Sequence, residues 1–202
     1  MEWRDLGIFL SKKPLGEHKF IYTFFTKNHG VYRGILSSPA TLFLGNIVEL
    51  LWTARLEEQL GTWTVEDILP SSERHHPMAF LYTHVMTIFV TTLLPERTPD
   101  ARLFQLWTKS LTLFSPSNTI IIYALWEKHF MTLLGYDDDS FHISDTMTSH
   151  QEWVLHLRRR HSFFLRTWPH FSLLHKARKD FIEKLAQHNE SLLVSKKYYR
   201  SS

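Results

Sequence analysis

The chain of 202 residues contains no cysteine, and this absence excludes several kinds of chemistry. Without thiols the protein forms no disulfide, no thiolate metal site and no cysteine nucleophile, which agrees with a reducing compartment. The chain also lacks the short motifs of serine hydrolases, zinc proteases, phosphate-binding loops and dinucleotide-binding folds. We therefore expect a protein that is not an enzyme and that needs neither a cofactor nor a metal ion.

Formal charge is absent from Met78–Leu94, an apolar segment that lies between Pro77 and Pro95. The segment is shorter than the roughly 20 residues that normally span a bilayer, and it contains His84 and several threonines. A membrane helix and a buried core helix are both consistent with this pattern, and we favour the core helix. The N-terminal residues Met1–Asp5 are charged, so we expect no signal peptide and no membrane contact.

Positive charge is concentrated near one end of the chain. Residues 151–202 hold 11 Lys and Arg against 4 Asp and Glu, whereas residues 1–70 hold 7 against 8 and residues 71–150 hold 5 against 8. A local excess of this kind is typical of a surface that meets a polyanion. The last quarter of the chain is therefore a candidate binding surface, with an ordinary solvated basic face as the alternative.

The first 70 residues are typical of short strands. Asn28–Gly30 supplies a glycine for a turn, and the segment that ends at Leu56 alternates apolar and polar residues with a period of two. Its apolar face would hold Val48, Leu50, Trp52, Ala54 and Leu56. The five predicted strands are Gly7–Ser11, Phe20–Thr26, Val31–Leu36, Ile47–Leu56 and Thr62–Leu69. Five short strands without long helices suit a small closed barrel of the OB type.

After Pro70 the period of the apolar residues changes from 2 to 3.6, which predicts helices. One helix is expected near 150–167 and another near 172–187, and Gly135 is the predicted C-cap of a third that starts at about Asn118. Three apolar stripes carry the earlier helices: Leu81, Val85, Ile88 and Phe89; Leu103, Leu106, Trp107, Leu111 and Phe114; and Ile121, Ile122, Leu125, Trp126, His129 and Leu133.

These elements predict a multi-domain α+β fold, with an N-terminal OB-type five-stranded β-barrel followed by an α-helical domain. We place the barrel at residues 1–70 and a linker at 71–77. The helical domain is expected at 78–190, and a basic C-terminal tail at 191–202.

Seven motifs follow one another along the chain. In the barrel region they are Trp3–Ser11, Leu15–Glu17, Phe25–Gly34, Gly45–Glu49 and Trp52–Gly61, and in the helical region Leu103–Leu106 and Trp126–Tyr136. Together they resemble the bacterial DNA repair and recombination family RecO. None of them is a catalytic signature. The specificity of the resemblance comes from their order and spacing, which is best over residues 1–69 and weaker to residue 136.

The resemblance implies a recombination mediator without catalysis. Such a protein binds single- and double-stranded DNA, anneals complementary strands and helps load the RecA recombinase onto DNA coated with single-stranded DNA-binding protein (SSB). It implies RecR and the C-terminal tail of SSB as partners, and a cytoplasmic, nucleoid-associated location in a bacterium. We also expect a monomer when the protein is on its own. The alternative is a protein-interaction adaptor with the same fold and weak or no DNA binding.

Candidate DNA contacts follow from chemistry, because each lysine or arginine that meets a phosphate displaces condensed counterions. The predicted contacts are Lys27, Arg33, Arg55, Arg158, Arg159, Arg160, Lys176, Arg178 and Lys179. Tyr22, Phe24 and Tyr32 are candidates either for base stacking or for the barrel core. A site for the SSB tail needs a cation for the terminal carboxylate, and Arg102, Lys109 and Lys128 are candidates for that role.

Overall fold

The computed structural model of the chain describes residues 1–17, 19–36, 40–56, 59–69, 77–112, 118–136 and 149–199, without the side chains of residues 77, 112, 162 and 188–199. The chain forms two compact units, Met1–Leu113 and Phe114–Ser202. The linker predicted at 71–77 lies outside the described residues, apart from the backbone of Pro77.

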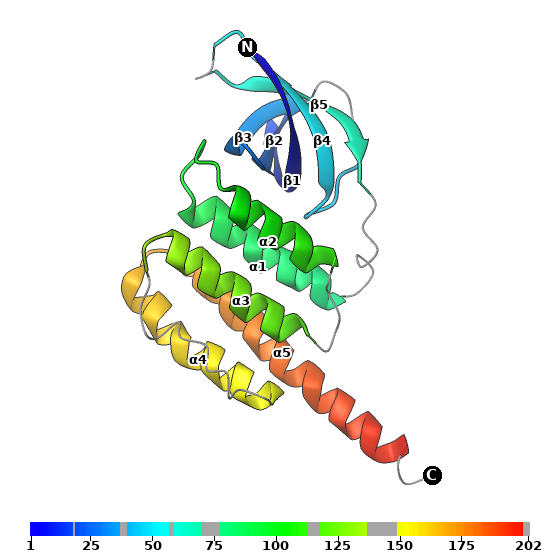
Figure 1. Cartoon of the computed structure of the whole chain (residues 1–202), viewed down its shortest axis with the longest axis vertical. Coiled ribbons are helices and arrows are strands. Elements are labelled where there is room, and N and C mark those ends of the chain that lie inside the picture. Colours follow the sequence, from blue (N-terminus) through cyan, green and yellow to red (C-terminus); the bar gives the residue numbers. More distant parts are fainter. Residues whose placement is uncertain are drawn as a thin grey trace. The chain divides into compact units, whose positions relative to one another are not determined.

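Five strands form a closed barrel at the N-terminus (Figure 1). They are β1 (Glu2–Leu15), β2 (Lys19–Thr26), β3 (Gly30–Leu36), β4 (Ile47–Thr53) and β5 (Gly61–Ile68). Their order around the barrel is β1-β2-β3-β5-β4, and only β3 and β5 run parallel. The predicted OB-type barrel is confirmed. Two predicted strand bounds are wrong, because β1 extends well beyond Gly7–Ser11 and β4 ends at Thr53, which leaves Leu56 exposed.

The long strand β1 joins two sides of the barrel. Its first half pairs with β4, from Glu2 opposite Thr53 to Ile8 opposite Ile47. From Gly7 to Leu15 it pairs with β2, with a register shift between Phe9 and Ser11. Such an irregularity bends a strand and raises its twist, which lets one strand take part in both sides of a small barrel.

Aromatic rings fill the barrel. Its core cluster consists of Phe9, Tyr22, Phe24, Tyr32, Val48, Leu50, Trp52 and Trp63, all buried. A Cβ atom at Gly61 would lie 2.3 Å from the ring of Trp52, so the absence of a side chain there lets the indole lie against the strand. The base-stacking role considered for Tyr22, Phe24 and Tyr32 is wrong, because these side chains are enclosed in the core.

Helices α1 (Pro77–Leu93) and α2 (Ala101–Thr112) belong to the same compact unit as the barrel. The ring of Phe25 packs against those of Phe104 and Trp107 on α2, with centroids 5.8 and 6.1 Å apart. The first unit therefore extends past the boundary predicted at residue 70. Among the described helices none is long and apolar enough to cross a membrane, and most of α1 is buried.

The second unit contains α3 (Thr119–Leu133), α4 (His150–Thr167) and α5 (Ser172–Tyr199). At the start of α4 the hydroxyl of Ser149 accepts from the backbone of Glu152, whose carboxylate accepts from the backbone of Ser149. This reciprocal cap fixes the first turn. Residues 191–199 of the predicted basic tail continue α5.

The buried face of α3 differs from the predicted stripe. Ile121, Leu125 and Leu133 are 37–48% exposed, and of that stripe only Trp126 is fully buried. The buried residues are Thr119, Ile120, Tyr123, Ala124, Trp126, Glu127, Phe130 and Met131. Since α3 carries apolar residues on all sides, periodicity alone does not select a face.

Candidate nucleic-acid interface

A buried carboxylate lies at the centre of the helical unit. Glu127 on α3 accepts hydrogen bonds from Nε and Nη2 of Arg178 on α5, at 2.7 and 3.0 Å, and from the hydroxyl of Tyr123 at 2.7 Å. Nη2 of Arg160 on α4 lies 3.0 Å from the same carboxylate. One acidic side chain therefore binds arginines from both neighbouring helices.

This cluster corrects two predicted DNA contacts. Arg160 is 2% exposed and Arg178 is fully buried, so neither guanidinium reaches a phosphate. Burial alone would raise the pKa of Glu127, but the guanidiniums of Arg178 and Arg160 lower that pKa to about 2. The carboxylate thus stays ionised and offsets part of the buried positive charge.

The other predicted cations of the helical unit lie at the surface. Arg158 and Arg159 on α4 and Lys176 and Lys179 on α5 are exposed. The three consecutive arginines are split by the helical period, because successive residues point about 100° apart. Arg158, Arg159, Lys176 and Lys179 thus remain available to a polyanion, and their role stays a prediction.

The predicted cations of the barrel unit are placed differently from one another. Lys27 is half-buried in the turn between β2 and β3, and Arg55 is exposed after β4. Arg33 on β3 is exposed but lies 2.9 Å from the carboxylate of Glu96, which follows α1. Its charge is therefore partly offset, although a pair this exposed is weak.

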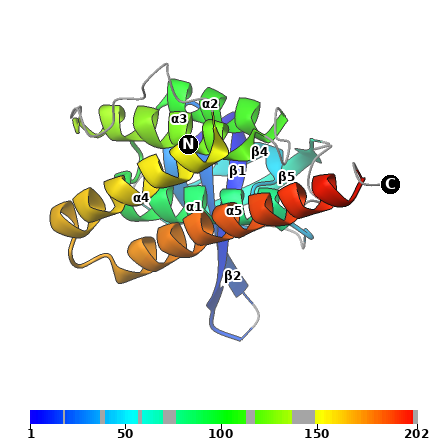
Figure 2. The ribbon, with the colours of Figure 1, turned by 90° about the horizontal axis from the view of Figure 1, so that it is seen from below.

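The structure adds three cations that sequence reasoning missed. Lys12, Lys13 and Lys19 are exposed on the β1–β2 hairpin, which projects from the barrel (Figure 2). Leu15 and Phe20 on the same hairpin are 40% and 37% exposed. The signal was present in the sequence, since residues 12–20 hold three lysines and one acid, but the predicted first strand ended at Ser11 and left the hairpin unrecognised.

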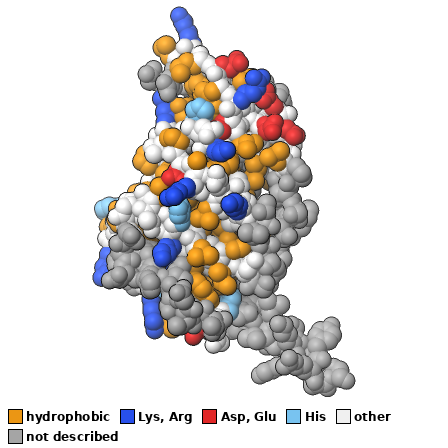
Figure 3. All heavy atoms as spheres, viewed as in Figure 1, with side chains coloured by type: hydrophobic (Ala, Val, Ile, Leu, Met, Phe, Trp, Pro, Cys, Tyr) orange, Lys and Arg blue, Asp and Glu red, His pale blue; other side chains and the backbone are white. Residues whose placement is uncertain are grey.

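An acidic side of the barrel limits where a polyanion can bind. Acidic side chains gather over β4 and β5 (Figure 3), where Glu49, Glu66 and Asp67 lie. There the guanidinium of Arg4 is paired with Glu66 at 3.0 Å, beside an open hollow of about 310 Å³. Repulsion from these carboxylates disfavours phosphate on this side.

Arg97, in the connection between α1 and α2, is a further cation that was not predicted. Its backbone has a φ of 60°, a conformation uncommon for a residue other than glycine. The backbone N–H of Arg97 donates to the carbonyl of Val31 at 3.1 Å, and its guanidinium carbon lies 5.3 Å from the ring centre of Tyr32. These contacts hold an exposed cation against the barrel.

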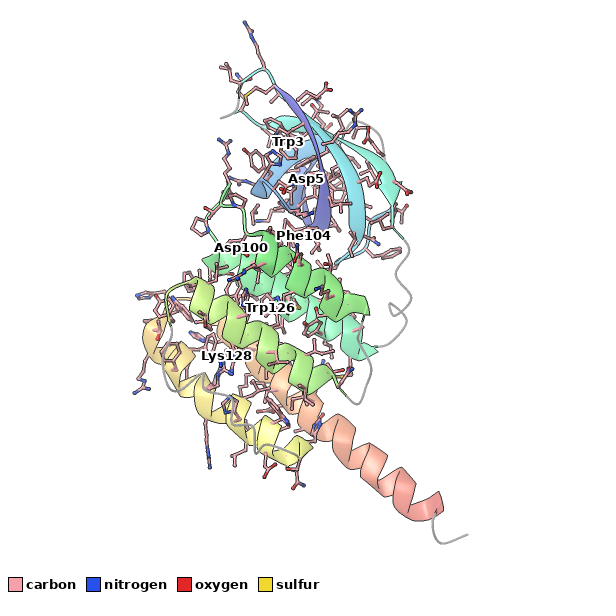
Figure 4. The ribbon with its side chains drawn as sticks, in the orientation of Figure 1. Trp3, Asp5, Asp100, Phe104, Trp126 and Lys128 are labelled. Carbon is pink, nitrogen blue, oxygen red and sulfur yellow. The ribbon has the colours of Figure 1, made fainter. Side chains whose placement is uncertain are left out.

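The residues predicted for tail binding belong to different units. Arg102 and Lys109 are exposed on α2 and seven residues apart, which puts them on the same side of the helix. Lys128 is half-buried on α3, next in sequence to the buried Glu127 (Figure 4). Their role in binding a carboxylate stays a prediction. Within the described part of the chain, no group of three His, Asp or Glu could hold a metal ion.

Comparison with known proteins finds similarity to RecO in a family model and in named relatives. The family model described as "Recombination protein O C terminal" matches residues 74–149. The DNA repair protein RecO of Rickettsia bellii is 34% identical over 147 residues, which is 69% of this chain and 61% of that protein.

Shorter matches have higher identity. The DNA repair protein RecO of Rickettsia felis is 50% identical over 66 residues, or 30% of this chain and 28% of that protein. An uncharacterised protein of Rickettsia prowazekii is also 50% identical over 66 residues, or 57% of its length. The chain thus spans less than two thirds of the length of these relatives. Together with the barrel and the helices that follow it, these matches make the chain a divergent member of the RecO family.

Proposed function

We propose that this chain is a non-catalytic recombination mediator that binds single- and double-stranded DNA. In this proposal it anneals complementary strands and helps load the RecA recombinase onto SSB-coated DNA, with RecR and the C-terminal tail of SSB as partners. The observation that carries the proposal is an OB-type barrel, in a chain of the RecO family, with three exposed lysines on its β1–β2 hairpin.

Charge neutralisation supplies the mechanism. Two DNA strands repel each other through their phosphates, and a protein that binds both lowers the free energy needed to bring them together. The exposed lysines of the β1–β2 hairpin and the exposed Arg158 and Arg159 are the groups proposed to do this. Contacts of this kind position the backbone of DNA and do not read its bases.

A titration of labelled single-stranded DNA across a salt series tests the proposal, with annealing of complementary strands followed in parallel. Each phosphate contact contributes about 0.7 to the slope of log affinity against log salt for a single strand. The variant K12E/K13E/K19E should therefore reduce the slope by about 2, and R158E/R159E by about 1. Arg4→Gln, on the acidic side, is the control and should leave the slope unchanged. No binding at low salt would overturn the proposal.

The adaptor function is the second candidate, and α3 is the observation that favours it. Three aliphatic side chains of this helix, Ile121, Leu125 and Leu133, are 37–48% exposed, which is typical of a surface that meets another protein. An adaptor would bind the SSB tail peptide while showing neither DNA binding at low salt nor faster annealing.

A further inference from the structure

A stack of aromatic rings lies at the end of the barrel away from α2. Trp3, near the start of β1, is labelled there in Figure 4, with Phe104 of α2 at the other end. Its ring lies 5.3 Å from those of Trp52 and Tyr32 and 5.5 Å from that of Trp63. Trp3 is half-buried and is therefore the outermost ring of an otherwise enclosed aromatic core.

The imidazole of His29 covers Trp3. The two ring centres are 3.8 Å apart and the planes are inclined by only 11°, so the rings are stacked. The side chain of His29 remains 31% exposed. The His29 ring thus extends the aromatic core of the barrel outward to the solvent.

A buried carboxylate holds this imidazole in place. The side chain of Asp5 is 2% exposed and accepts a hydrogen bond from Nδ1 of His29 at 3.0 Å. It also accepts from the backbone N–H and the side-chain amide of Asn28, at 2.7 and 2.9 Å, and from the backbone of Leu6 at 2.9 Å. These bonds fix both the turn and the plane of the ring.

A cation adjoins the stack. Arg97 lies over the ring of Tyr32, whose centre is 6.3 Å from that of His29. A flat, fixed ring beside an exposed arginine has the composition of a single-stranded nucleic-acid site, where bases stack on aromatic rings and phosphates meet lysine or arginine.

We propose that the His29 ring, stacked on Trp3 and held by Asp5, is a platform for one unpaired base, with Arg97 contacting an adjoining phosphate. This inference rests on the proposed DNA binding and adds to it a preference for single strands. In a duplex the bases are already stacked on one another, so the His29 ring adds no stacking free energy to the binding of double-stranded DNA. His29 contacts the base, and Asp5 is a positioning residue.

The test compares two oligomers of equal length and phosphate count, oligo-dT and a chain of abasic deoxyribose phosphates. The native chain should bind oligo-dT more tightly by roughly 5-fold or more, the factor expected for one stacked base. His29→Gln removes the ring and should bring the ratio close to one. His29→Tyr restores a ring and should restore the ratio. Asp5→Asn should lower the ratio, because the imidazole loses its anchor.

His84→Ala is the matched control. His84 is also an exposed histidine stacked on an aromatic ring, that of Phe80, with planes inclined by 6°, but it lies on α1. The substitution His84→Ala should leave the ratio of the two affinities unchanged. Thermal unfolding is used to check that each variant is folded. A ratio that His29→Gln does not change would overturn the platform and leave the proposed function standing. Failure of the native chain to bind either oligomer at low salt would overturn both.

Discussion

In the barrel unit the cations lie on the surface and aromatic rings form the core, whereas in the helical unit two arginines are part of the core. The sequence gives no hint of this difference, because Arg158, Arg159 and Arg160 are identical neighbours. Only the third turns inward, to a carboxylate on another helix. The comparison teaches that the number of basic residues overstates a binding surface wherever an acidic partner from a distant part of the chain lies in the interior.

The largest effect is expected from removal of that carboxylate. Glu127→Ala leaves Arg160 and Arg178 buried without their anion, and loss of one partner of a buried ion pair costs about 3–5 kcal/mol. The free energy of unfolding, measured with urea, should fall by that amount. Glu183→Ala on the exposed side of α5 is the control and should change it by less than about 0.5 kcal/mol. Equal effects of the two variants would contradict the role given to the cluster.

Two glycines of the barrel unit provide the next test, which concerns how closely the backbone packs there. Gly16 and Gly30 both have a positive φ, of 71° and 78°. A Cβ at Gly16 would meet nothing within 4 Å, whereas at Gly30 it would lie 2.4 Å from the carbonyl oxygen of Thr98. Gly16→Ala should therefore cost only the backbone term of about 1–2 kcal/mol.

Gly30→Ala should cost about 1–3 kcal/mol more than Gly16→Ala, since the turn must also move away from the connection that carries Arg97. The midpoints of thermal unfolding of the two variants measure the difference. If both midpoints fall equally, the close approach of that connection to the barrel is not a constraint.

The smallest effect is expected from pH, at His156 in the helical unit. Burial and the neighbouring Arg160 lower the pKa of His156 from 6.5 to about 4, and its Nε2 accepts from Nη1 of Arg160 at 3.2 Å. Between these two pH values the unfolded chain binds the proton and the folded chain does not. Stability is therefore lost as pH falls from 6.5 to about 4.

The same reasoning gives a second loss at lower pH, because Glu127 has its pKa lowered from 4.5 to about 2. In a plot of stability against pH, His156→Gln should remove the loss between pH 6.5 and about 4 and leave the loss at lower pH unchanged. The unfolding midpoint, measured at intervals from pH 7 to pH 3, distinguishes the two. The first effect is small because His156 is half-exposed, and a curve that is the same in native and variant protein would assign the loss to other groups.

The sequence predicts the barrel well because strand pairs with buried faces have a period of two that a reader can see. Trp52 and Leu50 are buried as expected. It predicts the face of α3 poorly, since that helix is apolar on all sides and the buried face carries the charged Glu127. The partners of Glu127, Arg160 and Arg178, lie on α4 and α5, and no local sequence pattern predicts such a contact.

The candidate site shows the same limit. Lys27 could be named from its charge, but His29, in the turn after β2, is held in place by Asp5 on β1. Arg97 lies in the connection between α1 and α2, and its backbone N–H donates a hydrogen bond to the carbonyl of Val31 on the barrel. Residue type identifies cations that are able to bind phosphate. Which of them lie beside an exposed aromatic ring is decided by tertiary contacts.

The parallel pairing of β3 with β5 has a consequence for how the barrel opens. These two strands close the barrel with three residue pairs, Gly34 with Gly61, Ile35 with Thr62 and Leu36 with Trp63. The antiparallel strand pairs β2–β3 and β4–β5 have longer ladders. A fluctuation that breaks the fewest hydrogen bonds separates β3 from β5 first. It would expose two unpaired strand edges, to which another extended chain could add a strand. The β3–β5 seam is therefore the shortest strand pairing of the barrel and the first place where unpaired strand edges would form.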